Sequence, residues 1–368
     1  MKCVVLLCLL ITRLFASNFV FVGSHTNPNV PNPVGLTIYS NHHGHLSEAF
    51  AQTNITTGNQ PTYMTVTQDR KFLYMSNEID FGHVSSFAIN DLDEKLTLQP
   101  LGLTPTNSDG PVHLVAAKSG KFVLIASYNI GSITVLSVDK NGFADRIVDQ
   151  IVYSGGSHVV PDRQEGPHAH CVMLSLYDNH AFVTDLGNDK IMQYHFNPST
   201  GKLTSNAVPF VYVGPGTLPR HMDFHPNGTI LYLTTEYSNE LKMYNYDPIS
   251  GTLSLLKSVT TTKATGVLTG AIHVTSNGEY VLISNRYGVP VSDDSIVVYT
   301  SDLEYVGTYS TSMWGGPRDF TITDDGFVYI TNENTNSIDT FRLQRNGQLK
   351  HLPLPQPSLF HPQVILPF

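Results

Sequence analysis

The chain has 368 residues, with 21 Lys and Arg against 30 Asp and Glu and a formal net charge of −9. That balance excludes the basic surface that nucleic acid or an anionic membrane requires of a partner. Charged residues make up only 14% of the chain, whereas Tyr and Phe supply 18 each and Gly and Pro 28 and 22. This composition favours strands and turns over surface helices.

The first residues have the pattern of a leader. Met1 and Lys2 precede a short apolar run, and the small residues Ala16 and Ser17 follow it. We therefore expect residues 1–17 to be a secretory signal peptide, and residues 18–368 to be exported as a single domain. Arg13, near the end of the run, keeps a mitochondrial leader open as an alternative, and a cytosolic location is disfavoured. No later stretch is long and apolar enough for a membrane span.

Cys171 is the one cysteine that remains after residues 1–17 are removed, so the mature chain cannot form an internal disulfide. We expect it to be a small core residue rather than a nucleophile. Asn54-Ile-Thr56 and Asn227-Gly-Thr229 match the glycosylation sequon, and a secretory route would make both sequons usable.

A unit of about fifty residues recurs along the chain. Each unit opens at a Pro or its equivalent, and in several units a Gly follows nine positions later, as from Pro111 to Gly120 and from Pro317 to Gly326. Stretches rich in β-branched and aromatic residues alternate with turns after that point. Four antiparallel strands per unit are typical of a β-propeller blade. The units open at Pro61, Pro111, Pro167, Pro219, Thr269 and Pro317.

The two ends of the mature chain carry fragments of one further unit. Residues 18–47 resemble strands two to four of a blade, and residues 362–368 resemble a first strand. Joined, they predict an all-β, seven-bladed propeller that is closed by pairing of the N- and C-terminal strands in one blade. A closed ring leaves no free sheet edge for aggregation.

In such a blade the start of strand one and the end of strand two lie at the same rim. Residues at these two positions should therefore gather around one mouth of the channel. Arg220 and Glu236 belong to the same blade and should be neighbours. The residues after the opening positions are Thr62, Val112, His168, Arg220, Gly270, Arg318 and Gln363, and those at the ends of strand two are Glu78, Tyr128, Asp185, Glu236, Arg286 and Glu333.

This combination of charges suits an anionic ligand that carries an ester or lactone. Arginines bind carboxylate or phosphate and stabilise a developing oxyanion. His168 or His170 can accept a proton from water or deliver one to a leaving oxygen, and Glu236 can orient the histidine or act as the base. The sequence lacks Gly-x-Ser-x-Gly, His-Glu-x-x-His, phosphate-loop and dinucleotide motifs, and the histidines of residues 42–45 lack the spacing of a zinc site. We therefore expect neither a cofactor nor a metal.

Four of these candidates also have a structural interpretation. Glu78 and Glu333 each follow Asn at a strand end, which favours solvated turn residues. Asp185 can tie down a turn through its own backbone. His273 stands between two apolar residues and fits a structural role as well as a functional one.

Linked motifs run through the mature chain: Gln164-x-x-Pro167-His-Ala-His170, Asp185-Leu-Gly-x-Asp189, Gly216-x-x-Pro219-Arg-His221, Phe224-His-Pro-Asn-Gly228, Ser284-Asn-Arg286 with Asp294-Ser-Ile296, and Gly316-Pro-Arg-Asp-Phe320. Together they resemble the seven-bladed lactonase family, which includes propeller-type 6-phosphogluconolactonases and carboxy-muconate cyclases. The resemblance covers nearly the whole mature chain and implies a cofactor-free site on the channel face. It places the family's histidine on His168 or His170. The arginine, glutamate and second arginine fall on Arg220, Glu236 and Arg286.

Two features depart from the family pattern. Ala271 stands where members usually carry Glu, and the segment 287–293 before Asp294 is longer. Our hypothesis is a hydrolase that opens an anionic, sugar-derived lactone by water attack, so its expected partner is a small anionic lactone or carboxylate. A carboxymuconate-type cycloisomerase and a secreted, non-catalytic binding propeller are the alternatives, and Ala271 favours the latter. The candidate catalytic residues are His168, His170, Arg220, Glu236 and Arg286, and the candidate substrate-binding residues are Arg318, His221, His273, Asp185 and Gln164.

Overall fold

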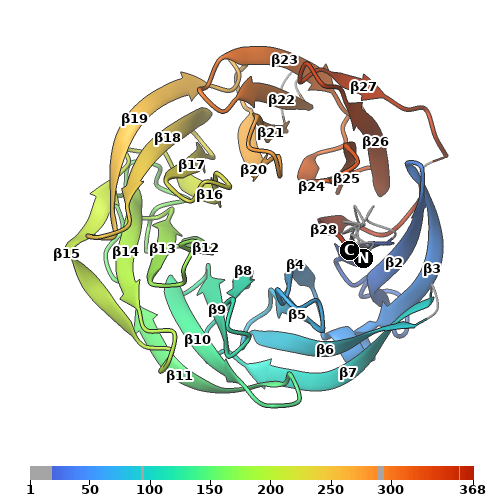
Figure 1. Cartoon of the computed structure of the whole chain (residues 1–368), viewed down its shortest axis with the longest axis horizontal. Coiled ribbons are helices and arrows are strands. Elements are labelled where there is room, and N and C mark those ends of the chain that lie inside the picture. The colour runs from blue at the N-terminus through green and yellow to red at the C-terminus, as the bar shows by residue number, and fades with distance from the viewer. Residues whose placement is uncertain (1–18, 93–94, 288–293, 356) are drawn as a thin grey trace, which may run out of the picture.

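In the computed structural model, seven four-stranded sheets stand as blades around a central channel (Figure 1). The structure describes residues 19–368 except 93–94, 288–293 and 356, so the expected signal peptide lies outside the described residues. Within the described part, neighbouring strands pair antiparallel and the single helix is α1 (Asn54–Thr57). No described helix reaches the length and apolar character of a membrane span. The all-β, seven-bladed prediction is confirmed.

Each blade runs from an inner strand at the channel to an outer strand at the circumference (Figure 1). The inner strands are β4 (Pro61–Val66), β8 (Pro111–Ala116), β12 (Ala169–Leu174), β16 (Pro219–Phe224), β20 (Leu268–Val274), β24 (Pro317–Ile322) and β28 (Pro362–Pro367). The second strands are β5 (Phe72–Asn77), β9 (Phe122–Ser127), β13 (His180–Asp185), β17 (Ile230–Thr235), β21 (Tyr280–Arg286), β25 (Phe327–Asn332) and β1 (Phe19–Ser24). The third strands are β6 (His83–Leu92), β10 (Ser132–Val138), β14 (Lys190–Phe196), β18 (Glu240–Asp247), β22 (Ser295–Thr300), β26 (Ser337–Leu343) and β2 (Val34–His42). The outer strands are β7 (Lys95–Pro105), β11 (Ala144–Val152), β15 (Leu203–Tyr212), β19 (Thr252–Thr260), β23 (Tyr305–Ser310), β27 (Leu349–His351) and β3 (His45–Thr53).

The apolar core consists of layers between adjacent blades. Val135 on β10 and Val183 on β13, for example, belong to one buried cluster. Second strands such as β9 and β13 are buried along their whole length, because a neighbouring blade covers each of their faces. The outer strand β15 is mostly exposed. The hydrophobic run of each second strand therefore reflects its place in the middle of a blade.

The ring closes through the two ends of the described chain. β28 pairs antiparallel with β1, with Val22 opposite Ile365, and the sheet order is β28-β1-β2-β3. The backbones of Phe19 and Phe368 exchange hydrogen bonds of 2.9 and 2.8 Å. The predicted closure by the N- and C-terminal strands in one blade is confirmed.

Every inner strand carries a register shift close to its first residue. At β8, for instance, Pro111 pairs with Ser127 and His113 with Ala126, so that Val112 has no partner in the ladder. A bulge of this kind bends the strand and re-aims the side chain of the extra residue. The bulge residues of the seven blades are Thr62, Val112, His170, Arg220 with His221, Gly270 with Ala271, Arg318 and Gln363.

Candidate active site

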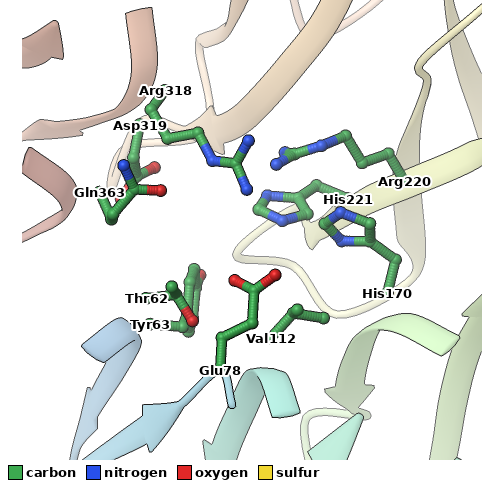
Figure 2. Close-up of a pocket in the computed structure, with 10 residues that line it drawn as sticks. All are labelled: Thr62, Tyr63, Glu78, Val112, His170, Arg220, His221, Arg318, Asp319 and Gln363. Carbon is green, nitrogen blue, oxygen red and sulfur yellow. The ribbon is translucent and has the colours of Figure 1, made fainter. Parts of the chain in front are cut away.

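The bulge residues of six blades line a pocket at the centre of the ring, and those of the blade with β20 do not. The pocket is narrow, with a cavity volume of about 10 Å³. Its side chains come from different blades and point toward one another (Figure 2). They are Thr62, Tyr63, Glu78, Val112, His170, Arg220, His221, Arg318, Asp319 and Gln363. Residues far apart in the sequence thus meet at the channel, as the rim argument predicted.

Glu236 is the acceptor for three arginines beside this pocket. Its Oε2 lies 3.0 Å from Arg220 Nε and 3.2 Å from Arg286 Nη2, and its Oε1 accepts a hydrogen bond of 2.6 Å from Arg163 Nη2. Burial alone would raise the pKa of Glu236, but the charges of Arg286, Arg163 and Arg220 lower it to about 2. Glu236 is therefore a permanent carboxylate that holds the arginines in place. The expectation that it can act as a base is wrong for this arrangement.

Several buried polar atoms around the pocket have no hydrogen-bond partner in the protein. They are Nη1 of Arg220, Nε of Arg286, Nδ1 of His170 and Oε1 of Gln363. Native proteins satisfy nearly all buried polar groups, so unpartnered atoms at a pocket indicate a place for a ligand or water. Burial, together with the charges of Arg220 and Arg318, holds the pKa of His170 well below its usual value. The imidazole of His170 is consequently neutral near pH 7.

Glu78 presents its carboxylate to the same space. Figure 2 shows it pointing toward the guanidinium groups of Arg220 and Arg318 and the imidazoles of His170 and His221. Burial raises the pKa of Glu78, and the positive charges of Arg318 and Arg220 oppose that effect. The interpretation of Glu78 as a solvated turn residue is wrong. It has the same place after strand two as Glu236, and this equivalence was the available signal.

Glu333 is also buried rather than solvated. Its carboxylate accepts hydrogen bonds from Gln363 Nε2 at 3.0 Å and from the Tyr287 hydroxyl, and it lies 3.7 Å from Arg286 Nη1. The solvated-turn interpretation is therefore wrong here too. Glu333 thus contacts Arg286 at Nη1, whereas Glu236 contacts it at Nη2.

His168 lies outside the pocket, although the sequence placed it in the ring. The ladder passes from Ala169 to Cys171, so His170 is the bulge residue of this blade. His168 Nδ1 lies 3.0 Å from the Tyr128 carbonyl oxygen and Nε2 lies 3.0 Å from Glu165 Oε1. Both ring nitrogens of His168 therefore face partners within the protein, and of the two histidines only His170 lines the pocket.

Asp185 and Gln164 form hydrogen bonds with backbone groups near the site. Asp185 accepts hydrogen bonds from the His168 and Asn188 amides, at 3.0 and 3.1 Å, because it pairs with Ala169 at the last rung of the ladder. The position equivalent to Glu78 and Glu236 is therefore one residue later, at Leu186. Gln164 Nε2 donates to the Leu186 carbonyl at 3.0 Å. Neither side chain lines the pocket, so the structure does not bring these two candidates together with the other site residues.

His221 and His273 continue the histidine set further along the channel. His221 lines the pocket, with its ring centroid 5.1 Å from that of His170, and burial holds its pKa well below the usual value. His273 is not part of the pocket lining, and its Nε2 lies 3.1 Å from Asp319 Oδ1. Burial opposes protonation of His273, but the hydrogen bond to Asp319 raises its pKa. His273 therefore reaches the pocket only through Asp319, which does line it.

Comparison with known proteins agrees with this geometry. The family described as "Lactonase, 7-bladed beta-propeller" matches residues 19–358. The chain belongs to this lactonase family. It is 31% identical to the 6-phosphogluconolactonase of Bacillus subtilis over 80% of this chain and 83% of the relative. It is 26% identical to the 6-phosphogluconolactonase of Formosa agariphila over 91% of this chain and 95% of the relative. The solved structure of the periplasmic gluconolactonase of Pseudomonas aeruginosa superposes with a TM-score of 0.83 at 26% identity, over 95% of this chain and 98% of that chain.

Two residues of this lactonase-family site do not occupy a repeat position, so the sequence repeat could not identify them. Arg163 comes from the connection between β11 and β12, and Tyr287 follows β21. Tyr287 accepts a hydrogen bond of 3.1 Å from Arg286 Nη1 and places its ring 4.9 Å from that guanidinium. Loop residues of this kind have no fixed register with the repeat, so only the fold places them.

The blade with β20 contributes no bulge side chain to the lactonase-family pocket. A Cβ on Gly270 would lie 2.5 Å from Ser284 Oγ and 3.5 Å from Arg286 Nε. Ala271 is buried, and its amide donates to Ser284 Oγ at 2.9 Å. Glycine at position 270 therefore leaves the space that Ser284 Oγ occupies. The longer segment noted in the sequence falls mainly on residues 288–293, which lie outside the described residues.

Among the described residues, no three histidine, cysteine or carboxylate side chains come together as metal ligands would. Cys171 is free and buried, and burial raises the pKa of its thiol to about 12. A thiol with that pKa is not a nucleophile near neutral pH.

Proposed function

We propose that the chain is a hydrolase that opens an anionic, sugar-derived lactone by attack of water. Membership of the lactonase family and the names of the relatives support the reaction class. The observation that carries the proposal to this chain is that buried polar atoms without a partner in the described part of the chain, Arg220 Nη1 and His170 Nδ1, belong to residues that line one pocket with Arg318 and Glu78. Preorganised donors in a site shielded from water are suited to an oxyanion that forms during ester hydrolysis.

In the reaction that we propose, Glu78 takes a proton from water as the water oxygen attacks the lactone carbonyl carbon. Arg220 and Arg318 stabilise the oxyanion. The ring C–O bond then breaks, and the leaving oxygen receives the proton held by Glu78, which gives a hydroxy acid. Glu78 suits the role of base because burial raises its pKa. Glu236 is paired with three arginines, and His170 is too weakly basic.

Replacing Glu78 by Gln is expected to lower kcat/KM for lactone hydrolysis by about 100- to 10,000-fold, which is the usual contribution of a general base. In the wild type, kcat/KM should fall as the pH drops through the pKa of Glu78, above the ordinary value of 4.5, because only the carboxylate accepts a proton. The variant should lack this acid limb. Initial rates with gluconolactone and its 6-phosphate, corrected for spontaneous opening, measure both effects.

Glu48→Gln on the exposed part of β3 is the matched control and should retain full activity. A Glu78→Gln variant with wild-type kcat/KM would remove Glu78 from the mechanism. If wild-type protein opens no lactone but binds the acids that such opening would yield, the protein is a binding propeller and not a hydrolase.

We further propose that the chain enters the secretory route and is glycosylated. The leader-like residues 1–17 and the sequon at Asn227 support this proposal. Asn227 is exposed in the turn between β16 and β17, at the rim opposite the start of the inner strands, so a glycan there would leave the pocket open. Expression with its own leader in a eukaryotic host should give secreted protein whose mass falls by one glycan in Asn227→Gln. Retention inside the cells without glycan would contradict export.

A further inference from the structure

The connection between β11 and β12 crosses the rim that carries the pocket, and Arg163 lies on it. Gln164, which is fully buried, fixes the backbone next to Arg163. Its Nε2 donates to the Leu186 carbonyl at 3.0 Å, and its Oε1 accepts from the Val160 amide at 3.0 Å. The Ser157 amide donates to the Gly187 carbonyl at 2.8 Å. The loop is thus attached to the neighbouring blade at two places, which holds Arg163 in position.

The guanidinium of Arg163 uses one nitrogen for its contacts with the protein. Nη2 donates to Glu236 Oε1 at 2.6 Å and lies 3.4 Å from the Tyr128 hydroxyl. No hydrogen bond joins Nε or Nη1 to another residue in the described part of the chain. The side chain is 32% exposed, whereas those of Arg220 and Arg286 are 2% and 4% exposed. Arg163 is therefore the partner of Glu236 that an incoming ligand can reach.

Among the described residues, the nearby carboxylates leave Nε and Nη1 of Arg163 without a hydrogen-bond partner. Glu236 already holds Arg220 and Arg286 through its other oxygen, and Glu165 is paired with His168 Nε2 at 3.0 Å. Asp162 is exposed. A guanidinium that is fixed through Nη2 keeps N–H donors at Nε and Nη1, on two edges of the group, and a phosphate or carboxylate can accept from these donors.

We propose that Arg163 binds an anionic substituent of the lactone, remote from the ring carbonyl, and so sets the preference for a phosphorylated over a neutral sugar lactone. This inference rests on the proposed function of the same site. The buried arginines then stabilise the oxyanion at the lactone carbonyl, and Arg163 binds the anionic substituent at the other end of the substrate. Glu236 joins the two regions, since it contacts both Arg163 and Arg220.

The test compares the wild type, Arg163→Gln and Arg163→Lys on gluconolactone and on its 6-phosphate. In Arg163→Gln the ratio of the two kcat/KM values should fall by about 10- to 100-fold, the value of a charge-assisted hydrogen-bonded contact, mainly through KM for the phosphorylated lactone. Arg163→Lys should retain part of the preference, because it keeps the charge and loses the guanidinium donors Nε and Nη1. Arg146→Gln, on the exposed part of β11, is the control and should leave the ratio unchanged.

An equal loss on both lactones would overturn the inference and make Arg163 a support for Glu236 alone. An unchanged ratio would overturn it as well. If the wild type opens neither lactone, the proposed function fails, and calorimetry with gluconate and 6-phosphogluconate still tests Arg163. Weaker binding of the phosphorylated acid alone in Arg163→Gln would then support the anion site, and equal effects on both acids would refute it.

Discussion

Deleting residues 362–368 is expected to lower the thermal midpoint by more than about 10 °C or to abolish cooperative unfolding altogether. The deletion removes β28, the inner strand of the blade that closes the ring. Val364, Ile365 and Phe368 are only 2%, 2% and 5% exposed, and each buried apolar side chain contributes about 1.5–3 kcal/mol. The summed loss approaches the entire stability of about 5–15 kcal/mol that a typical protein has. Circular dichroism during heating measures the change.

A circular permutant separates ring closure from the mere loss of seven residues. The backbones of Phe19 and Phe368 are hydrogen-bonded to each other, so a short Gly linker can join them. The new ends are placed in the exposed turn at residues 198–200, between β14 and β15. The permutant keeps every strand and should unfold near the wild-type midpoint. A truncated chain as stable as the wild type would refute the role of β28 in closure.

Replacing Glu236 by Gln is expected to destabilise the folded state by about 3–5 kcal/mol, because it leaves buried guanidinium groups without a counter-charge. The effect should depend on pH. The pKa of Glu236 is lowered from 4.5 to about 2, so its carboxylate stabilises the fold above about pH 4.5, and this stabilisation is lost as the pH falls toward 2. Urea unfolding at pH 7 and at pH 3 measures both effects. The difference in stability between wild type and variant should be smaller at pH 3.

Glu279→Gln, an exposed carboxylate in the turn between β20 and β21, is the matched control and should change stability by less than about 0.5 kcal/mol at either pH. A Glu236→Gln variant with wild-type stability at pH 7 would show that the arginines find other partners. The proposed role of Glu236 as their anchor would then be wrong.

The architecture was predictable because its signal is repeated. The opening Pro, the Gly nine positions later and the strand-rich stretches recur along the chain, so local uncertainty in one unit is corrected by the others. The pairing of residues 362–368 with the N-terminal strand followed from the two incomplete units, and the sheet order β28-β1-β2-β3 confirms it.

The site residues could be predicted from the sequence only where they occupy regular positions of the repeat. Arg220, Arg286 and Arg318 occupy regular positions, and the structure brings them together. His168 was placed two residues too early in the register, because the extra bulge residue of its blade is His170. No local pattern distinguishes the two, since both are histidines beside the same Pro.

Arg163 could not be predicted from the sequence, for a different reason. It belongs to a connection between blades, and its contact with Glu236 spans a sequence separation of 73 residues. Only the closed ring brings the two together. Burial was a second feature that the sequence did not reveal: Glu78 and Glu333 have the sequence context of turn residues, but Glu333 is buried and the half-buried Glu78 lines the pocket.

The bulge at the head of every inner strand has a consequence for how this architecture diversifies. Since a bulge residue takes no part in pairing, exchanging its side chain leaves the sheet intact and alters only what the blade presents to the pocket. The bulge position of a blade therefore sets what that blade presents to the pocket, except where the bulge residue is also a buried ion-pair partner, as Arg220 is of Glu236. Exchanging a bulge residue without such a pair, for example Val112, can change substrate range while the strand pairing is retained.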